Sequence, residues 1–263
     1  MQLALLTGTV TFLIAFSGTL SNLLVLLSAQ NMLSMNSSFG LITKNQAFCN
    51  ILMCLTFLFY IFPMQVAREP FFLEYSHFIG VFLMTLYEVS VCSHLFIALN
   101  RLCTVFWPAR YDSFFSYHLT EHIRNGIWLL SVITCTILYK LLGCHFTFNP
   151  NSLSMEFLPT CSDLTWYSDF ILNTSLVAIT LLINLITLYK AGRNRKIRNV
   201  AVGIKLSIGQ QKRKLNFLKQ TFSQGTAIFT GQVAYYLIVP MVQNHIFEFF
   251  FVTLWAYIHF LEG

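Results

Sequence analysis

The sequence has few charged residues. Asp, Glu, Lys and Arg make up 10% of its 263 positions, whereas a soluble domain carries about a quarter. Hydrophobic residues account for 56% of the chain and aromatic residues for 16%. This shortage of charge excludes an ordinary soluble domain and indicates that lipid is the solvent for most of the chain.

The sequence also lacks the short motifs that accompany catalysis. It contains no His-Glu-x-x-His, no Gly-x-Ser-x-Gly and no glycine-rich phosphate loop. Its histidines are dispersed, and only His118 and His122 stand four residues apart, in a predicted loop. There is no internal repeat and no separate soluble segment. We therefore predict one domain over residues 1–263, with no enzyme activity, no metal site and no cofactor.

Negative charge is missing from the most basic part of the chain. Ten of the sixteen Lys and Arg residues lie within 190–219, and that range contains no Asp or Glu. A basic run can bind nucleic acid, but this one lies between two apolar segments. Loops that flank membrane spans on the cytoplasmic side are enriched in Lys and Arg. We therefore predict a cytoplasmic loop here and no nucleic-acid partner.

Long apolar stretches fill most of the sequence. A helix needs about 20 mostly apolar residues to cross a lipid bilayer, and continuous runs favour helices over the ten-residue alternations of a barrel. The first stretch lacks a basic leader and a cleavage site, so we expect a helix there and not a signal peptide. The sequence thus predicts an all-α membrane protein, a seven-helix transmembrane bundle whose last helix ends at the chain terminus. The predicted spans are 3–28, 42–66, 75–106, 123–143, 164–189, 217–242 and 246–263.

The loops predict the orientation of this bundle. A cytoplasmic loop at 190–219, with spans that alternate in direction, places the N-terminus outside the cell. The loops at 67–74, 144–163 and 243–248 are then external. Their charges agree with this assignment, because Arg68 is their one Lys or Arg residue and they carry five acids, which are Glu69, Glu74, Glu156, Asp163 and Glu248.

Ionisable groups at membrane depth are costly and indicate functional sites. Glu88 and His94 lie inside the third predicted span. At 100° per residue, Tyr87, His94 and Arg101 share one stripe of this helix, and Glu88 lies more than a quarter-turn away. Glu88 could line a ligand cavity, with Tyr87 as a second contact, or it could be a hydrogen-bonded acid that holds helices together. We expect His94 to form a hydrogen bond between helices.

Two of the seven cysteines fall in a predicted external loop. Cys144 and Cys161 lie within 144–163, on the oxidising side of the membrane. They either form a disulfide or remain two free thiols. The other five cysteines fall in or near apolar stretches and are expected to be small packing residues.

The segment "NRLCTVFWPARY" ends the third span with an arginine that has no obvious partner in the sequence. Pro108 ends the helix because it lacks an N–H and disfavours helical geometry in the residue before it. Arg101 then lies about two turns inside the cytoplasmic end. The Arg101, Pro108 and Tyr111 spacing resembles the Asp/Glu-Arg-Tyr segment and following Pro and Tyr of rhodopsin-like G-protein-coupled receptors. Asn22 in "GTLSNLLVL" resembles their first-helix Asn-x-x-Val motif, and Asn50 stands where their second-helix Asp lies; we expect both to be structural polar residues.

A narrower resemblance covers most of the chain. The segments "SSFGLITKNQAFCNILMCLTFLFYIFPM", "NRLCTVFWPARYDSFFS" and "LNFLKQTFSQ" look like the nematode serpentine receptor class x, a chemoreceptor family. The resemblance implies a receptor in the plasma membrane of sensory neurons that binds a small-molecule ligand. Leu83 occupies the position of the Asp of amine receptors, which argues against a biogenic amine. The resemblance also implies coupling to a heterotrimeric G protein through Arg101, Asn100, Pro108 and Tyr111.

The sequence departs from the receptor pattern at several positions. Asn100 replaces the acid before Arg101, so the usual acid–arginine pair is absent. Ser76 stands where the third helix would carry its disulfide cysteine. The familiar bridge from that helix to the loop therefore cannot form, which favours a Cys144–Cys161 bridge within the loop.

The last span is short. Residues 246–263 make only about 27 Å of helix, which leaves open a truncated, non-signalling receptor relic. A small membrane transporter is a further alternative. Transporters typically show broken helices in two corresponding halves, and no such symmetry is visible in the sequence.

Overall fold

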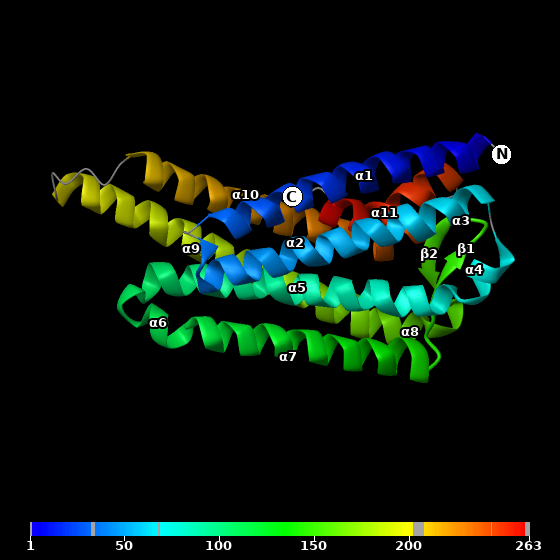
Figure 1. Ribbon diagram of the computed structural model, residues 1–263, viewed down its shortest axis with the longest axis horizontal. Coiled ribbons are helices and arrows are strands. Elements are labelled where there is room, and N and C mark those ends of the chain that lie inside the picture. Colours follow the sequence, from blue (N-terminus) through cyan, green and yellow to red (C-terminus); the bar gives the residue numbers. More distant parts are fainter. Residues whose placement is uncertain (1, 33–34, 68, 202–207, 243, 261–263) are drawn as a thin grey trace.

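The computed structural model describes residues 2–32, 35–67, 69–201, 208–242 and 244–260. It is mostly helical, with the long helices running side by side along one axis (Figure 1). The elements in chain order are α1 (Gln2–Asn31), α2 (Ser38–Thr56), η2 (Phe57–Ile61), α3 (Phe62–Ala67), α4 (Pro70–Glu74), α5 (Ser76–Phe106), η3 (Pro108–Arg110), α6 (Tyr111–Phe114), α7 (Tyr117–Thr136), η4 (Ile137–Leu141), β1 (Phe146–Asn149), β2 (Ser154–Phe157), η5 (Pro159–Cys161), α8 (Ser162–Thr165), η6 (Trp166–Ile171), α9 (Leu172–Ala201), α10 (Ile208–Val233), η7 (Ala234–Ile238), η8 (Val239–Met241) and α11 (His245–Phe260).

Four of the described helical segments are long and apolar enough to cross a bilayer, judged by length and composition. The remaining predicted spans correspond to α7 with η4, to α10 with η7 and η8, and to α11. Residues 202–207 of the basic run and 261–263 of the last predicted span lie outside the described residues. The four segments are Leu3–Asn31, Ser38–Ala67, Ser76–Phe106 and Pro159–Arg193.

Local capping signals explain where several helices begin and end. Helix α5 ends at Phe106, two residues before Pro108, as the sequence predicts. Helix α7 begins at Tyr117, where Oγ of Ser116 accepts a hydrogen bond from the backbone N–H of Leu119 at 3.3 Å. The helix thus begins six residues before the predicted span 123–143, and the serine cap satisfies one of its first free N–H groups.

The predicted loop at 144–163 contains a β-hairpin, so the expectation of an all-α chain was wrong in this segment. Strands β1 and β2 are antiparallel, with Phe146 opposite Phe157 and Asn149 opposite Ser154. A disulfide joins Cys144 to Cys161, with their Cα atoms 5.4 Å apart. The bond holds together the two ends of the segment, and this closure favours pairing of the short strands between them.

The hairpin packs closely on α5. Gly80 faces the backbone of Phe146 so tightly that a Cβ atom at Gly80 would overlap the Phe146 carbonyl oxygen. Glycine is therefore required for this approach. Figure 1 places the hairpin at the same end of the bundle as the start of α1, and opposite the C-terminal end of α9 and the N-terminal end of α10. The main core includes Phe57, Leu86 and Tyr139 of the helical segments together with Phe146 and Phe148 of the hairpin.

Candidate functional site

A group of polar side chains is buried between α5, α9 and the segments η6 and η7. Nδ2 of Asn173 donates hydrogen bonds to Oε1 of Glu88 and to Oδ1 of Asp169, each at 2.9 Å. The hydroxyl of Tyr236 donates to Oδ2 of Asp169 at 2.6 Å. Asp169 is only 5% exposed. We call Glu88, Asp169, Asn173 and Tyr236 the carboxyl cluster.

The local helix geometry positions this cluster. Asp169 and Asn173 are four residues apart on one continuous helical segment, so their side chains lie on the same face. Asp169 belongs to the π-helical stretch η6 and Tyr236 to the π-helical stretch η7. Such stretches are rare and often occur at functional sites. The ring of Tyr236 packs against Phe170, with centroids 4.8 Å apart, which fixes the direction of its hydroxyl.

The two carboxyl groups have no cationic neighbour in the described part of the chain. Among the side chains that the structure describes, no Lys, Arg or His forms an ion pair with Glu88 or Asp169. Buried carboxylates without a positive partner are costly. A hydrogen-bond donor or a cation placed beside them would offset that cost, so the cluster is suited to binding a group of that kind.

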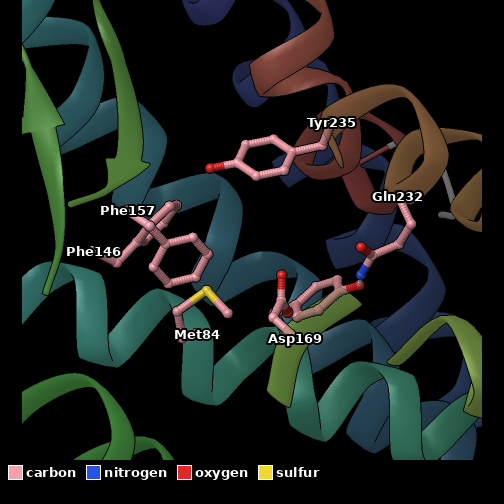
Figure 2. A pocket seen from close by; sticks show the side chains of 7 residues that line it. Met84, Phe146, Phe157, Asp169, Gln232 and Tyr235 are labelled. Atoms are coloured by element: carbon pink, nitrogen blue, oxygen red, sulfur yellow. Dashed lines mark hydrogen bonds between the residues drawn. The ribbon is translucent and has the colours of Figure 1, made fainter. Parts of the chain in front are cut away.

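A narrow cavity opens beside Asp169. Its empty space is about 320 Å³ including the opening, and about 20 Å³ of that can be reached by the centre of a water molecule. As it stands the cavity therefore holds about one or two waters, and a larger guest requires side chains to move. In Figure 2, Phe146 and Phe157 of the hairpin lie opposite Asp169 and Gln232 of the helices. The lining residues are Met84, Tyr87, Phe146, Phe157, Asp169, Gln232 and Tyr235.

The two ligand contacts expected from the sequence lie at different distances from this cavity. Tyr87 lines it, and its hydroxyl accepts a hydrogen bond from Nε2 of Gln232. Glu88 does not line it, but reaches Asp169 through Asn173. The sequence analysis missed Asp169. An acid inside the apolar stretch 164–189 satisfies the same criterion that selected Glu88, so that signal was present.

The expected structural residues Asn22 and Asn50 lie in a second polar group. Nδ2 of Asn50 donates to Oδ1 of Asn22 at 3.1 Å. Nδ2 of Asn22 donates to the backbone carbonyls of Gly18 at 2.9 Å and Phe260 at 3.1 Å. Three helices, α1, α2 and α11, are joined by these bonds.

The same polar group continues toward α5. Nε2 of Gln46 donates to Oγ of Ser90 at 2.6 Å and lies 3.2 Å from Nε2 of His94. Oγ of Ser90 lies 3.2 Å from Nδ1 of His259, within hydrogen-bond distance. His94 thus forms a hydrogen bond between α5 and α2. We call this group the amide–imidazole network, and its members are Asn22, Asn50, Gln46, Ser90, His94 and His259.

The residues expected to couple to a G protein lie at the far end of α5. Arg101 is only 8% exposed, and its guanidinium carbon is 5.6 Å from the centroid of the Phe39 ring. Nδ2 of Asn100 donates to the hydroxyl of Tyr111 at 2.9 Å. Pro108 opens η3, the turn that carries the chain from α5 to Tyr111. Arg101 is therefore packed against α2 in this state.

The chain was compared with known proteins. The family model described as "Serpentine type 7TM GPCR chemoreceptor Srx" matches residues 12–263. The chain belongs to this family. The resemblance to serpentine receptor class x proteins is thereby confirmed. The family is a receptor family and not an enzyme family, and the apolar helices agree with a multi-pass membrane protein.

Two relatives of this Srx chain come from Caenorhabditis elegans. "Serpentine receptor class X-43" is 25% identical over 261 residues, which cover 94% of this chain and 78% of that relative. "Serpentine receptor class X 45" is 20% identical over 233 residues, covering 86% of this chain and 64% of that relative. The Srx chain thus spans less than two thirds of the second relative's length.

Proposed function

We propose that this Srx chain is a chemosensory receptor in the plasma membrane of sensory neurons. It binds a small extracellular molecule and signals through a heterotrimeric G protein. The observation that carries the proposal is the family match over residues 12–263. The buried carboxyl cluster beside a cavity supports it, because ligand sites combine an apolar lining with a few placed polar groups.

The proposed topology has seven spans, with the N-terminus and the hairpin outside. In Figure 1 the C-terminal end of α9 and the N-terminal end of α10 lie at the opposite end from the hairpin. The basic run 190–219 includes both of these helix ends. Its positive charge supports a cytoplasmic position. The hairpin carries the disulfide, which agrees with the oxidising side of the membrane.

The proposed ligand site is the cavity beside the carboxyl cluster. Asp169, Tyr87 and Gln232 supply polar groups, and the hairpin supplies the aromatic wall of Phe146 and Phe157. A ligand that fits this lining has a small apolar body and a hydrogen-bond donor or positive charge directed at Asp169. Its binding displaces the hairpin or Tyr235, because the cavity is narrow in this state.

Signal transfer is proposed to end at Arg101, with Asn100, Pro108 and Tyr111 shaping its surroundings. Arg101 packs on Phe39 in this state. A ligand that binds a more open form of the cytoplasmic end better than the closed form shifts the population toward it. Arg101 then leaves Phe39 and contacts the G protein.

The test is expression in a heterologous cell with a panel of volatile and water-soluble chemicals, read as calcium or cAMP. Arg101→Ala should abolish the response and leave surface expression intact. Arg110→Ala is the matched control, since Arg110 is exposed at the same end of the bundle. Unchanged ligand-evoked signalling in Arg101→Ala would contradict the coupling role. Solute flux through the purified protein in liposomes would instead indicate a transporter.

A further inference from the structure

Two histidines that are far apart in the sequence lie beside each other at the hairpin end of the bundle. His77 is the second residue of α5, and His145 directly precedes strand β1. Their ring centroids are 5.3 Å apart, with an angle of 51° between the ring planes. Both side chains are partly exposed. A dissolved ion therefore has access to the pair.

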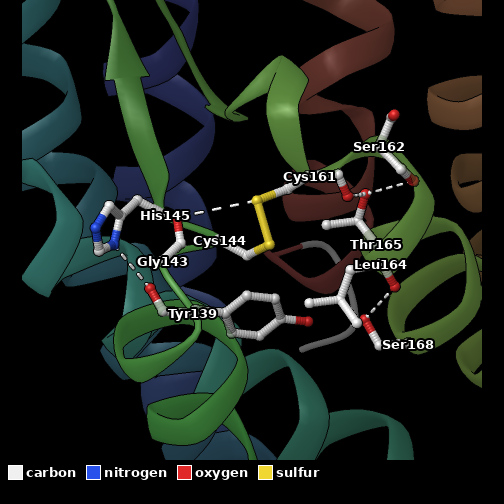
Figure 3. The surroundings of a disulfide bond; sticks show 9 residues. All are labelled: Tyr139, Gly143, Cys144, His145, Cys161, Ser162, Leu164, Thr165 and Ser168. Atoms are coloured by element: carbon white, nitrogen blue, oxygen red, sulfur yellow. Dashed lines mark hydrogen bonds between the residues drawn. A yellow bond between two sulfur atoms is a disulfide. The ribbon is translucent and has the colours of Figure 1, made fainter.

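Both rings are held through the same nitrogen. Nδ1 of His145 lies 2.9 Å from the carbonyl oxygen of Tyr139, a contact drawn in Figure 3. Nδ1 of His77 lies 3.2 Å from the carbonyl oxygen of Glu74. A carbonyl can only accept, so each Nδ1 carries the hydrogen and donates it. In the neutral ring each Nε2 then presents a lone pair, as it does in histidines that bind a metal through Nε2 while Nδ1–H is held by a carbonyl.

The distance between the rings fits one shared metal ion. Two imidazoles that bind a tetrahedral Zn²⁺ at about 2.0–2.1 Å have ring centroids about 5.2 Å apart. The observed separation of 5.3 Å is close to this value. Many pairs of neighbouring aromatic rings have similar distances, so the hydrogen bonding of both rings through Nδ1 is a necessary second observation.

The backbone around the pair is firmly held. The N–H of His145 donates to the carbonyl of Gly143 at 3.0 Å, and its carbonyl accepts from the N–H of Leu158 at 3.2 Å. One turn after His77, Gly80 meets the backbone of Phe146. A metal site gains affinity when its ligands are positioned in advance, and these contacts position both histidines.

We propose that His77 and His145 form a binding site for a divalent transition-metal ion such as Zn²⁺, with water completing the coordination. The bound ion links the N-terminal end of α5 to the base of the hairpin, and so holds Phe146 at the cavity wall. The site stands independently of the proposed function. One charge lies nearby, on Lys140, whose Nζ is 4.1 Å from the centroid of the Phe78 ring beside His77.

The test is a Zn²⁺ titration of the purified full chain in lipid nanodiscs, with free Zn²⁺ set by a chelator. It is made in a His118→Ala background, because His118 and His122 stand four residues apart on α7 and could bind metal themselves. His77→Ala and His145→Ala should each weaken binding by at least the about 10–100-fold that the loss of an outer-shell partner costs. His122→Ala should leave the affinity unchanged, and Lys140→Gln should increase it by removing a nearby positive charge.

An affinity that is unchanged in either His77→Ala or His145→Ala would overturn the shared site. A second measurement avoids the possibility that a variant misfolds. Diethyl pyrocarbonate modifies accessible imidazole nitrogens, and the sites of modification can be assigned by mass spectrometry in the unsubstituted chain. Zn²⁺ should protect His77 and His145 together. Equal modification of both residues with and without Zn²⁺ would contradict the proposal.

Discussion

The carboxyl cluster and the amide–imidazole network share helix α5 but differ in chemistry. Glu88 belongs to the cluster and Ser90 to the network, and side chains two residues apart on a helix point about 200° apart. Glu88 therefore faces Asn173 of α9, whereas Ser90 faces Gln46 of α2 and His259 of α11. One helix thus carries two polar groups on nearly opposite faces.

The two groups differ in whether their own side chains supply both the donors and the acceptors that their hydrogen bonds require. Amides, hydroxyls and imidazoles can both donate and accept, so a neutral network can satisfy itself. Ionised carboxylates only accept, and Glu88 and Asp169 share one donor in Asn173. The network is therefore suited to holding helices together, and the cluster is suited to binding a hydrogen-bond donor or a cation.

The largest expected effect is on stability, from breaking the network. Asn50→Leu removes the donor to Oδ1 of Asn22 and leaves that buried oxygen without it. An unsatisfied buried polar group costs about 1–3 kcal/mol. The thermal midpoint of the purified chain in detergent should fall. Phe59→Leu is the control on the same helical segment, since Phe59 is 73% exposed. Equal midpoints for both variants would show that the network does not stabilise the bundle.

Asp169→Asn should separate ligand binding from stability. The change keeps the size of the side chain and removes its negative charge. A hydrogen bond to a charged group contributes about 1.5–3 kcal/mol, so ligand potency should fall by about tenfold or more. The thermal midpoint should not fall, because a buried charge has been removed. Asp163→Asn, at an exposed acid on α8, should change neither quantity. A large drop in the midpoint with unchanged potency would give the cluster a structural role instead.

Glu88→Gln should have a smaller effect on potency. Glu88 does not line the cavity, and a Gln carbonyl can still accept the hydrogen bond from Asn173. We expect ligand potency to fall by less than about tenfold, which is equivalent to less than about 1.4 kcal/mol of binding free energy. The measurement is the ligand dose–response curve beside that of Asp169→Asn. A greater loss in Glu88→Gln than in Asp169→Asn would place the primary contact at Glu88.

Local signals in the sequence account for the parts of the fold that could be predicted. Continuous apolar runs locate the long helices, and Pro108 marks the end of α5 because its effect acts on neighbouring residues. The hairpin could not be located in this way. Its packing on α5 depends on the close approach of Gly80 to Phe146, two residues that are distant in the sequence.

The candidate site could be predicted only in part. Glu88 and Asp169 are acids within apolar stretches, and that criterion can find both of them. Tyr236 and Gln232 lie in the apolar stretch 217–242 but do not meet that criterion, because neither is an acid. Their roles arise from where α10 and η7 pack against η6 and α5. The closeness of His77 and His145 likewise follows from the packing of the hairpin on α5.

The smallest expected change concerns the end of α5, away from both polar groups. Asn100→Asp restores an acid beside Arg101. The hydrogen bond with Tyr111 can survive, because the tyrosine hydroxyl can donate to the new carboxylate where it now accepts from Nδ2 of Asn100. A negative charge beside Arg101 should favour the closed state and lower ligand-free signalling, measured as basal cAMP or calcium at matched surface expression. Asn100→Leu is the control that removes the bond to Tyr111 without adding charge. If both variants change basal signalling equally, the Tyr111 contact and not the missing acid restrains this end of the helix.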